Sequence, residues 1–181
     1  MQVEQTPIEG LLIIKPKVYF DERGYFLESY NQNLFNALTG LHIHWKQDNE
    51  SRSEKGVLRG LHLQIPPTAQ DKLVRVVQGS VWDVAVDLRK NSPTYAQHFG
   101  IELNARNKYQ FLIPKGFAHA FQVLENDTIF EYKCSETYSP DHECVIRWND
   151  VDLNIKWPLA PAILSDRDNN AAPFSHFQSP F

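Results

Sequence analysis

Residues 72–88 read KLVRVVQGSVWDVAVDL, and this stretch decides the fold class. It contains two runs rich in valine, Lys72–Gln78 and Val81–Leu88, on either side of Gly79. β-Branched residues favour strands, and a glycine between two such runs is a typical turn signal. The stretch therefore predicts two β-strands that are separated at the glycine.

Similar short runs recur along the chain. They are rich in Val, Ile, Phe and Tyr, are separated by Gly, Pro, Asn or Asp, and cover Leu11–Phe20, Val57–Gln64, Tyr109–Ile113, Phe117–Leu124 and Thr128–Cys134. One clear helix is predicted from Asn31 to Leu38, where Gly40 stops it, and a weak helical signal lies near the C-terminus. Many short strands with almost no helix predict a mainly β protein, either a sandwich or a closed barrel.

Composition narrows the function classes. The 181 residues contain no linker-like stretch, which predicts a single domain over residues 1–181. The formal net charge of −4 gives no sign of a nucleic-acid partner. No apolar run approaches the ~18–20 residues of a membrane span, and residues 1–10 lack the features of a signal peptide. Cys134 and Cys144 are expected to be free thiols, so we expect a cytoplasmic protein without a membrane partner.

Strict alternation along four strands places one titratable side chain on each inward-facing stripe, which predicts a lined pocket. The stripes are Leu58, Gly60, His62 and Gln64; Lys72, Val74 and Val76; Phe117, His119 and Phe121; and Thr128, Phe130 and Tyr132. Alternation puts Arg59 on the face opposite His62. A bulge at Gly60 would rotate Arg59 to the face of His62, and a position near the barrel mouth would also let Arg59 reach the pocket. The sequence leaves the choice between these two open.

Two motifs resemble those of the cupin superfamily, whose fold is a jelly-roll barrel. They are GVLRGLH at residues 56–62 and PKGFAH at residues 114–119. Metal-binding cupins supply two histidines and a glutamate near the first motif and a third histidine in the second. Here Gln64 and Lys72 stand at two of these four positions, and a protonated lysine has no lone pair for a metal. The motifs predict a cupin-type jelly-roll β-barrel with few short helices and no bound metal.

A pocket lined by His62, Lys72, His119 and Tyr132 combines a base, a cation and an acid, without a convincing nucleophile. Proton abstraction beside a carbonyl needs these three parts. A neutral imidazole removes the proton, a cation stabilises the enolate oxygen, and a tyrosine can return a proton to the other face. Histidine also needs an orienting partner. Asp168 is a candidate for that partner, although spacing alone does not place it there.

Seven stretches in order, from Leu12 to about Asp168, resemble the dTDP-4-dehydrorhamnose 3,5-epimerase family. They are FDERGYFLESYN, QDNESRSEKGVLRGLHLQ, KLVRVVQGSVWDVAVDLRKNSPTYAQ, IPKGFAHAF, YSPDHE, IRWND and LSDRD. The resemblance implies an isomerase of carbohydrate (dTDP-rhamnose) biosynthesis that inverts C3 and C5 of dTDP-4-dehydro-6-deoxy-glucose through an enolate at C4, giving dTDP-4-dehydro-L-rhamnose. It implies no cofactor, a dTDP-sugar as ligand, and a homodimer in which N-terminal strands join the partner's sheet.

The resemblance also implies roles for individual residues. His62 would be the general base, and Asp168 would orient it. Tyr132 would be the acid on the opposite face, while Lys72 would stabilise the enolate. Tyr138 would stack on the thymine ring, and the remaining matches to the family's nucleotide-sugar contacts are Arg23, Glu28, Gln47, Asn49, Arg59, Lys72, His119, Glu143 and Arg167.

Three alternatives remain open at this point. A related enzyme on the same fold would epimerise one carbon or isomerise the keto group, and one sequence does not distinguish these reactions. A non-catalytic sugar-nucleotide-binding cupin would have no use for a base and an acid, so His62 and Tyr132 argue against it. A metal-dependent cupin oxygenase is disfavoured by Gln64 and Lys72. The sequence also does not identify the pathway that the product enters.

Overall fold

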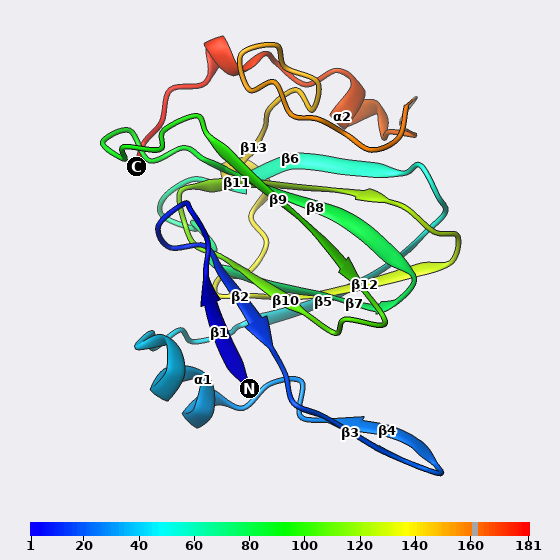
Figure 1. Ribbon diagram of the computed structural model, residues 1–181. Helices are drawn as coiled ribbons and strands as arrows, with labels where there is room; N and C mark the ends of the chain where they lie inside the picture. The colour runs from blue at the N-terminus through cyan, green and yellow to red at the C-terminus, as the bar shows by residue number, and fades with distance from the viewer. Residues whose placement is uncertain (161–162) are drawn as a thin grey trace.

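The computed structural model describes residues 1–160 and 163–181, and over these residues two antiparallel sheets face each other (Figure 1). The six-stranded sheet has the order β1 (Gln2–Gln5), β2 (Leu12–Lys15), β10 (Gln110–Ile113), β7 (Lys72–Gln78), β12 (Thr128–Cys134) and β5 (Gln47–Ser53). The five-stranded sheet has the order β13 (Glu143–Val145), β6 (Leu58–Gln64), β11 (Phe117–Val123), β8 (Ser80–Asp87) and β9 (His98–Asn104). This arrangement confirms the predicted mainly β, jelly-roll class, although hydrogen bonds do not close the described strands into a continuous barrel.

The helices are few and short among the described residues. Helix α1 (Gln32–Thr39) begins where the Asn31 side chain accepts a hydrogen bond from the Leu34 amide, and it ends at Gly40 in the left-handed conformation. It confirms the predicted helix to within one residue. Helix α2 (Asp166–Asn169) has Ser165 as its N-cap. Within the described residues no helix is long and apolar enough to cross a membrane.

The strands predicted from apolar runs agree with the structure to within about one residue, with one exception. The sequence predicts a single strand over Leu11–Phe20, whereas the structure divides it into β2 and β3 (Val18–Asp21). Pro16 lies at the break and has no N–H for a sheet hydrogen bond. Strand β3 pairs with β4 (Gly24–Leu27), and this hairpin extends away from the two sheets (Figure 1).

Apolar layers hold the sheets in place, and two of them border the five-stranded sheet. The inner layer lies between the sheets and contains Val74, Val76, Val81, Ala85, Phe111, Phe117, Phe121 and Phe130. The outer layer lies against the other face of the five-stranded sheet, where Phe174, Phe177 and Phe181 of the C-terminal tail pack on it. Figure 1 shows this tail and α2 running across the same side of the molecule as β6. The tail thereby carries Asp168 to the five-stranded sheet.

A bulge in β6 corrects one predicted stripe. His119 on β11 is opposite His62, but Phe121 is opposite Arg59, so two β6 residues face one β11 residue. Arg59 and His62 therefore share the inner face, as the bulge alternative requires. The stripe that joined Leu58 and Gly60 to His62 is wrong. Gly60 has φ of 123°, where a Cβ would collide with the His119 carbonyl, so a larger residue would not fit this close approach.

Candidate active site

Polar side chains from both sheets meet at a cavity of about 250 Å³. Strands β5, β6, β7 and β12 contribute most of its lining, which consists of Gln47, Asn49, His62, Leu63, Gln64, Gln70, Lys72, Tyr132, Cys134, Tyr138 and Glu143. The sequence predicts seven of these residues as site residues. Their assembly follows from register, since Gln47 is opposite Cys134 and Asn49 is opposite Tyr132 in the β5–β12 pair.

His62 and Asp168 form a close pair at the five-stranded sheet. His62 Nε2 lies 2.5 Å from Asp168 Oδ1, and the Asp168 side chain is almost completely buried. Burial opposes ionisation of Asp168, but hydrogen bonds from His62, Ser165 and the Gly60 amide outweigh it and lower its pKa below the ordinary value. An ionised carboxylate accepts only, so Nε2 carries the proton and Nδ1 keeps a free lone pair.

A second histidine–carboxylate pair lies deeper between the sheets. His119 Nε2 is 3.0 and 2.9 Å from the two Asp83 oxygens, and Asp83 is fully buried. Burial raises the pKa of Asp83 and lowers the pKa of His119, and their mutual attraction opposes both shifts. Asp83 is not among the site residues predicted from the sequence. Its signal was a carboxylate inside the otherwise apolar run of β8, where a buried charge needs a partner.

Lys72 begins β7 and is opposite Cys134 of β12, so its side chain shares the inner face with the valines that follow it. Burial is the main influence on the ammonium and lowers the pKa of Lys72, while Cys134, Glu143 and Asp83 act in the opposite direction. Cys134 is buried beside it, and desolvation raises the pKa of its thiol to about 11. At neutral pH this thiol is therefore protonated and a poor nucleophile.

The four cupin positions do not suit a metal ion. Lys72 brings a cation with no lone pair at the position of a ligand, and the Gln64 amide is engaged with backbone groups. His62 and His119 each bind a carboxylate instead. Among the described residues, no group of three or more His, Cys, Asp or Glu side chains is placed to hold a metal.

Tyr132 faces the same cavity from the opposite sheet. It lies on β12, whereas His62 lies on β6, and both line the cavity. Burial is the main cause that raises the pKa of Tyr132 above its ordinary value, and the positive charge of Arg59 opposes this. The phenol is therefore protonated at neutral pH and can donate. The imidazole and the phenol therefore reach one cavity from opposite sheets.

A small network of a hydrogen bond and an ion pair lies at the outer part of the cavity. The Tyr138 hydroxyl donates to Glu143 Oε2 at 2.6 Å, and Arg167 Nη1 lies 2.6 Å from the same oxygen. Tyr138 is half exposed, so part of its side chain is open to a ligand. A second hollow of about 400 Å³ adjoins His62 and includes Arg59, Arg167 and Asp168 in its lining. The guanidinium group of Arg59 beside the cavity suits a diphosphate, whereas that of Arg167 is already paired with Glu143.

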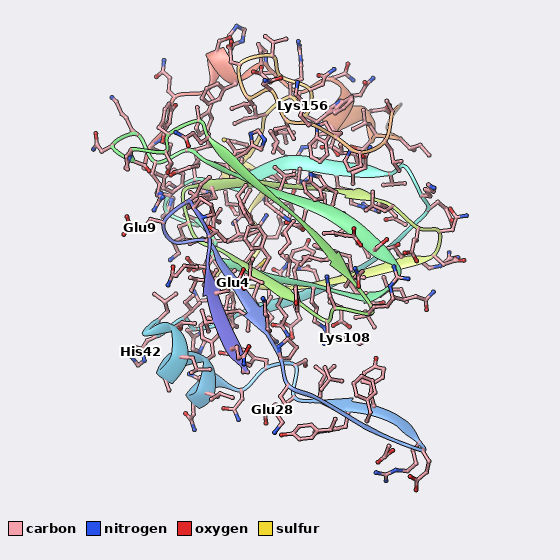
Figure 2. All side chains as sticks on the ribbon, viewed as in Figure 1. Glu4, Glu9, Glu28, His42, Lys108 and Lys156 are labelled. Atoms are coloured by element: carbon pink, nitrogen blue, oxygen red, sulfur yellow. The ribbon has the colours of Figure 1, made fainter. Side chains whose placement is uncertain are left out.

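Arg23 and Glu28 are not brought to this cavity within the chain. Arg23 sits at the turn of the β3–β4 hairpin, where its side chain is 84% exposed and contacts Asp21. Figure 2 places Glu28 beside the base of the same hairpin, away from the face-to-face sheets. Neither residue is among the lining of either hollow. The contact of these two residues with a nucleotide sugar stays a prediction.

Comparison with known proteins agrees with this geometry. The family model described as dTDP-4-dehydrorhamnose 3,5-epimerase matches residues 5–176. The chain belongs to this epimerase family. A family relative from Shigella flexneri, named dTDP-4-dehydrorhamnose 3,5-epimerase, is 51% identical over 174 residues and covers 96% of each chain. Membership confirms the family predicted from the seven stretches and the predicted class of enzyme.

Solved structures of the epimerase family share the fold. The Legionella pneumophila protein, in complex with dTDP-4-keto-L-rhamnose, has a TM-score of 0.94 at 47% identity over 98% of this chain and 94% of its own. A 3'-monoepimerase from Streptomyces bikiniensis, in complex with dTDP-quinovose, has a TM-score of 0.89 at 33% identity over 97% and 88%. The family fold therefore carries out epimerisation at one carbon in at least one relative.

Proposed function

We propose that this protein inverts C3 and C5 of dTDP-4-dehydro-6-deoxy-glucose, with His62 as the base and Tyr132 as the acid. The observation that carries the proposal is that these two side chains reach one cavity from opposite sheets. Inversion needs a proton to leave one face of a carbon and another to arrive on the other face. Turnover in heavy water tests the proposal, because each inverted carbon acquires one deuterium.

The first step is removal of a proton by His62 Nδ1. Asp168 holds the ring through Nε2 and stays ionised because its pKa is lowered. The carboxylate therefore stabilises the imidazolium that forms after proton transfer. The C4 ketone already acidifies the C–H bonds of C3 and C5, so the proposed reaction asks for no cofactor.

Lys72 is proposed to stabilise the enolate oxygen at C4. The ammonium lies on the inner face with little competing solvent, where an interaction with a developing negative charge is strong. C4 is bonded to both C3 and C5. One cation at the C4 oxygen therefore serves both inversions.

Replacing Lys72 with Met separates charge from volume. We expect turnover of Lys72→Met to fall by about 10²–10³-fold, by analogy with loss of one oxyanion donor. The free energy of unfolding should rise by about 1 kcal/mol, because burying an ammonium is costly. Burial lowers the pKa of Lys72 in the folded state. Between that lowered pKa and 10.5, the folded wild type therefore binds fewer protons than the unfolded chain. Wild-type stability should therefore increase with pH in that window.

Initial rates and urea unfolding at several pH values check both parts. Near-normal turnover by folded Lys72→Met would remove Lys72 from enolate stabilisation. If the free energy of unfolding of Lys72→Met depends on pH in this window as that of the wild type does, another group causes the dependence.

The nucleotide is proposed to lie across the outer network. Tyr138 would stack on the thymine ring, with Gln47, Asn49, Glu143 and Arg167 around it. Arg59 would bind the diphosphate, since it lies on the same inner face as His62 and contacts Ser53. His119 lines neither hollow, and it would contact the sugar from its buried place opposite His62.

We further propose a homodimer in which the β3–β4 hairpin reaches the site of a second copy. Four aromatic side chains of the hairpin are more than half exposed, which is unusual for a free surface, and they are Tyr19, Phe20, Tyr25 and Phe26. Arg23 and Glu28 lie on or beside this hairpin. A second copy that covers the aromatics would give both residues a nucleotide to bind.

Mixed dimers test the use of Arg23 by the second copy. Arg23→Ala and His62→Asn should each be nearly inactive at substrate concentrations below KM. Dimers that contain one chain of each kind would have one intact site of two, so the purified mixed dimers should recover about half of wild-type activity. Co-expression with two tags, followed by tandem purification and an activity assay, checks this. Mixed dimers without activity would mean that Arg23 serves its own chain or no site.

The compartment is also a proposal. Cys134 and Cys144 are both free thiols, which supports a reducing environment such as the cytoplasm. We likewise propose that residues 1–181 act as one domain, because the C-terminal tail packs on the sheet that carries His62.

A further inference from the structure

Gln64 ends β6 at the position where a metal-binding cupin has a histidine, and its side chain is buried. The amide nitrogen donates to the Thr68 carbonyl at 2.7 Å and to the Thr137 carbonyl at 3.2 Å. The amide oxygen accepts from the Ser139 backbone N–H at 2.8 Å. One side chain therefore binds three backbone groups in two loops that border the cavity.

These contacts hold the backbone on both sides of Tyr138. Gln64 holds the residue before it and the residue after it, Thr137 and Ser139. The Tyr138 backbone N–H itself donates to Gln47 Oε1 at 2.9 Å. Three consecutive residues are thus tied to two glutamine side chains from strands of opposite sheets. The half-exposed Tyr138 ring projects from a backbone that these side chains fix.

An amide meets the requirement of this position better than the alternatives. Two carbonyl oxygens need two donors, and one backbone N–H needs an acceptor, and a primary amide supplies all three. A neutral histidine supplies one donor and one acceptor, whereas a glutamate at neutral pH supplies acceptors only. A methionine has similar volume but supplies no N–H donor. The hydrogen bonds of Gln64 therefore explain why glutamine stands here.

We propose that Gln64 is a positioning residue that fixes the Tyr138 ring for stacking on the nucleotide base. The inference rests on the proposed function, since it assumes that Tyr138 contacts the base. Gln64 lines the cavity, but its amide groups are already used by the protein. Its effect on the ligand therefore passes through the loop of Tyr138. A ring held in the bound orientation spares the ligand the entropic cost of ordering that loop.

The test is the affinity of dTDP for Gln64→Glu, measured by isothermal titration calorimetry. The substitution keeps the shape but removes both donors and places a carboxylate oxygen against the Thr68 and Thr137 carbonyls. We expect the Kd for dTDP and the KM for the sugar nucleotide to rise about tenfold, with kcat changed less than about threefold. Gln64→Met serves as the second variant if Gln64→Glu does not fold.

A double-mutant cycle with Tyr138→Ala separates positioning from a general effect. If Gln64 acts through the ring, Gln64→Glu should weaken dTDP binding little further once the ring is absent. Gln122→Glu is the matched control, because the buried Gln122 binds the backbone of Leu159 through both amide atoms, on a part of the chain that carries no proposed nucleotide contact. It should lower the free energy of unfolding without changing the dTDP affinity.

Several outcomes would overturn the inference. Unchanged dTDP affinity in folded Gln64→Glu would show that the loop does not depend on Gln64. Additive losses in the double variant would mean that Gln64 acts independently of Tyr138. Failure of the proposed function is distinguishable, because in that case the wild type itself would not bind dTDP or would not turn over the 4-keto sugar.

Discussion

His62→Asn is expected to lose turnover by at least about 10³–10⁴-fold and to lose solvent-deuterium exchange into the substrate to the same extent. Without the imidazole no group on this face removes the C3 or C5 proton, so no enolate forms. Asparagine is smaller and can still donate a hydrogen bond to Asp168. The fold and the affinity for dTDP should therefore change little.

NMR of the recovered substrate in heavy water measures this exchange. His98→Asn is the matched control, because His98 lies on β9 of the same five-stranded sheet and outside the cavity lining. It should keep wild-type exchange and turnover. Persistent exchange in His62→Asn, at more than about a hundredth of the wild-type rate, would assign the base to another residue.

Tyr132→Phe is expected to separate exchange from inversion. The substitution removes only the hydroxyl, so the packing of the ring on the inner layer is kept. His62 can still form the enolate, exchange its proton with solvent and return deuterium to the same face. Deuterium should therefore enter recovered substrate while inverted product falls by about 10²–10⁴-fold.

Tyr138→Phe is the control for the second tyrosine in the cavity. It removes the hydroxyl that donates to Glu143, and we expect inversion to continue at a rate close to wild type. Unimpaired inversion by Tyr132→Phe would assign the donor to Tyr138 or to a bound water. Loss of exchange in Tyr132→Phe would place Tyr132 in enolate formation instead.

The fold could be predicted where strands are apolar and bounded by turn residues. Strands β7 and β12 have the predicted bounds, since their inner faces are packed with Val and Phe. Strand β5 reads QDNESRS and was missed, because its inner face is the polar wall of the cavity. The same polar residues that build the site conceal the strand that carries them.

The site could be predicted in part. Alternation places Lys72, His119 and Tyr132 on inner faces, and the structure confirms those faces. Pairing with Asp168 depends on how the C-terminal tail crosses the five-stranded sheet, which local spacing does not encode. The face of Arg59 depends on a bulge that follows from the close approach of two strands at Gly60.

The most direct test of the central claim is the number of deuterium atoms that the wild-type protein introduces per turnover. Purified protein is incubated with dTDP-4-dehydro-6-deoxy-glucose in heavy water, and the product is analysed by NMR and mass spectrometry. We predict inverted configuration and deuterium at both C3 and C5, a mass increase of two deuteriums per product. A product inverted and labelled at a single carbon would contradict double epimerisation and would identify a monoepimerase on the same fold.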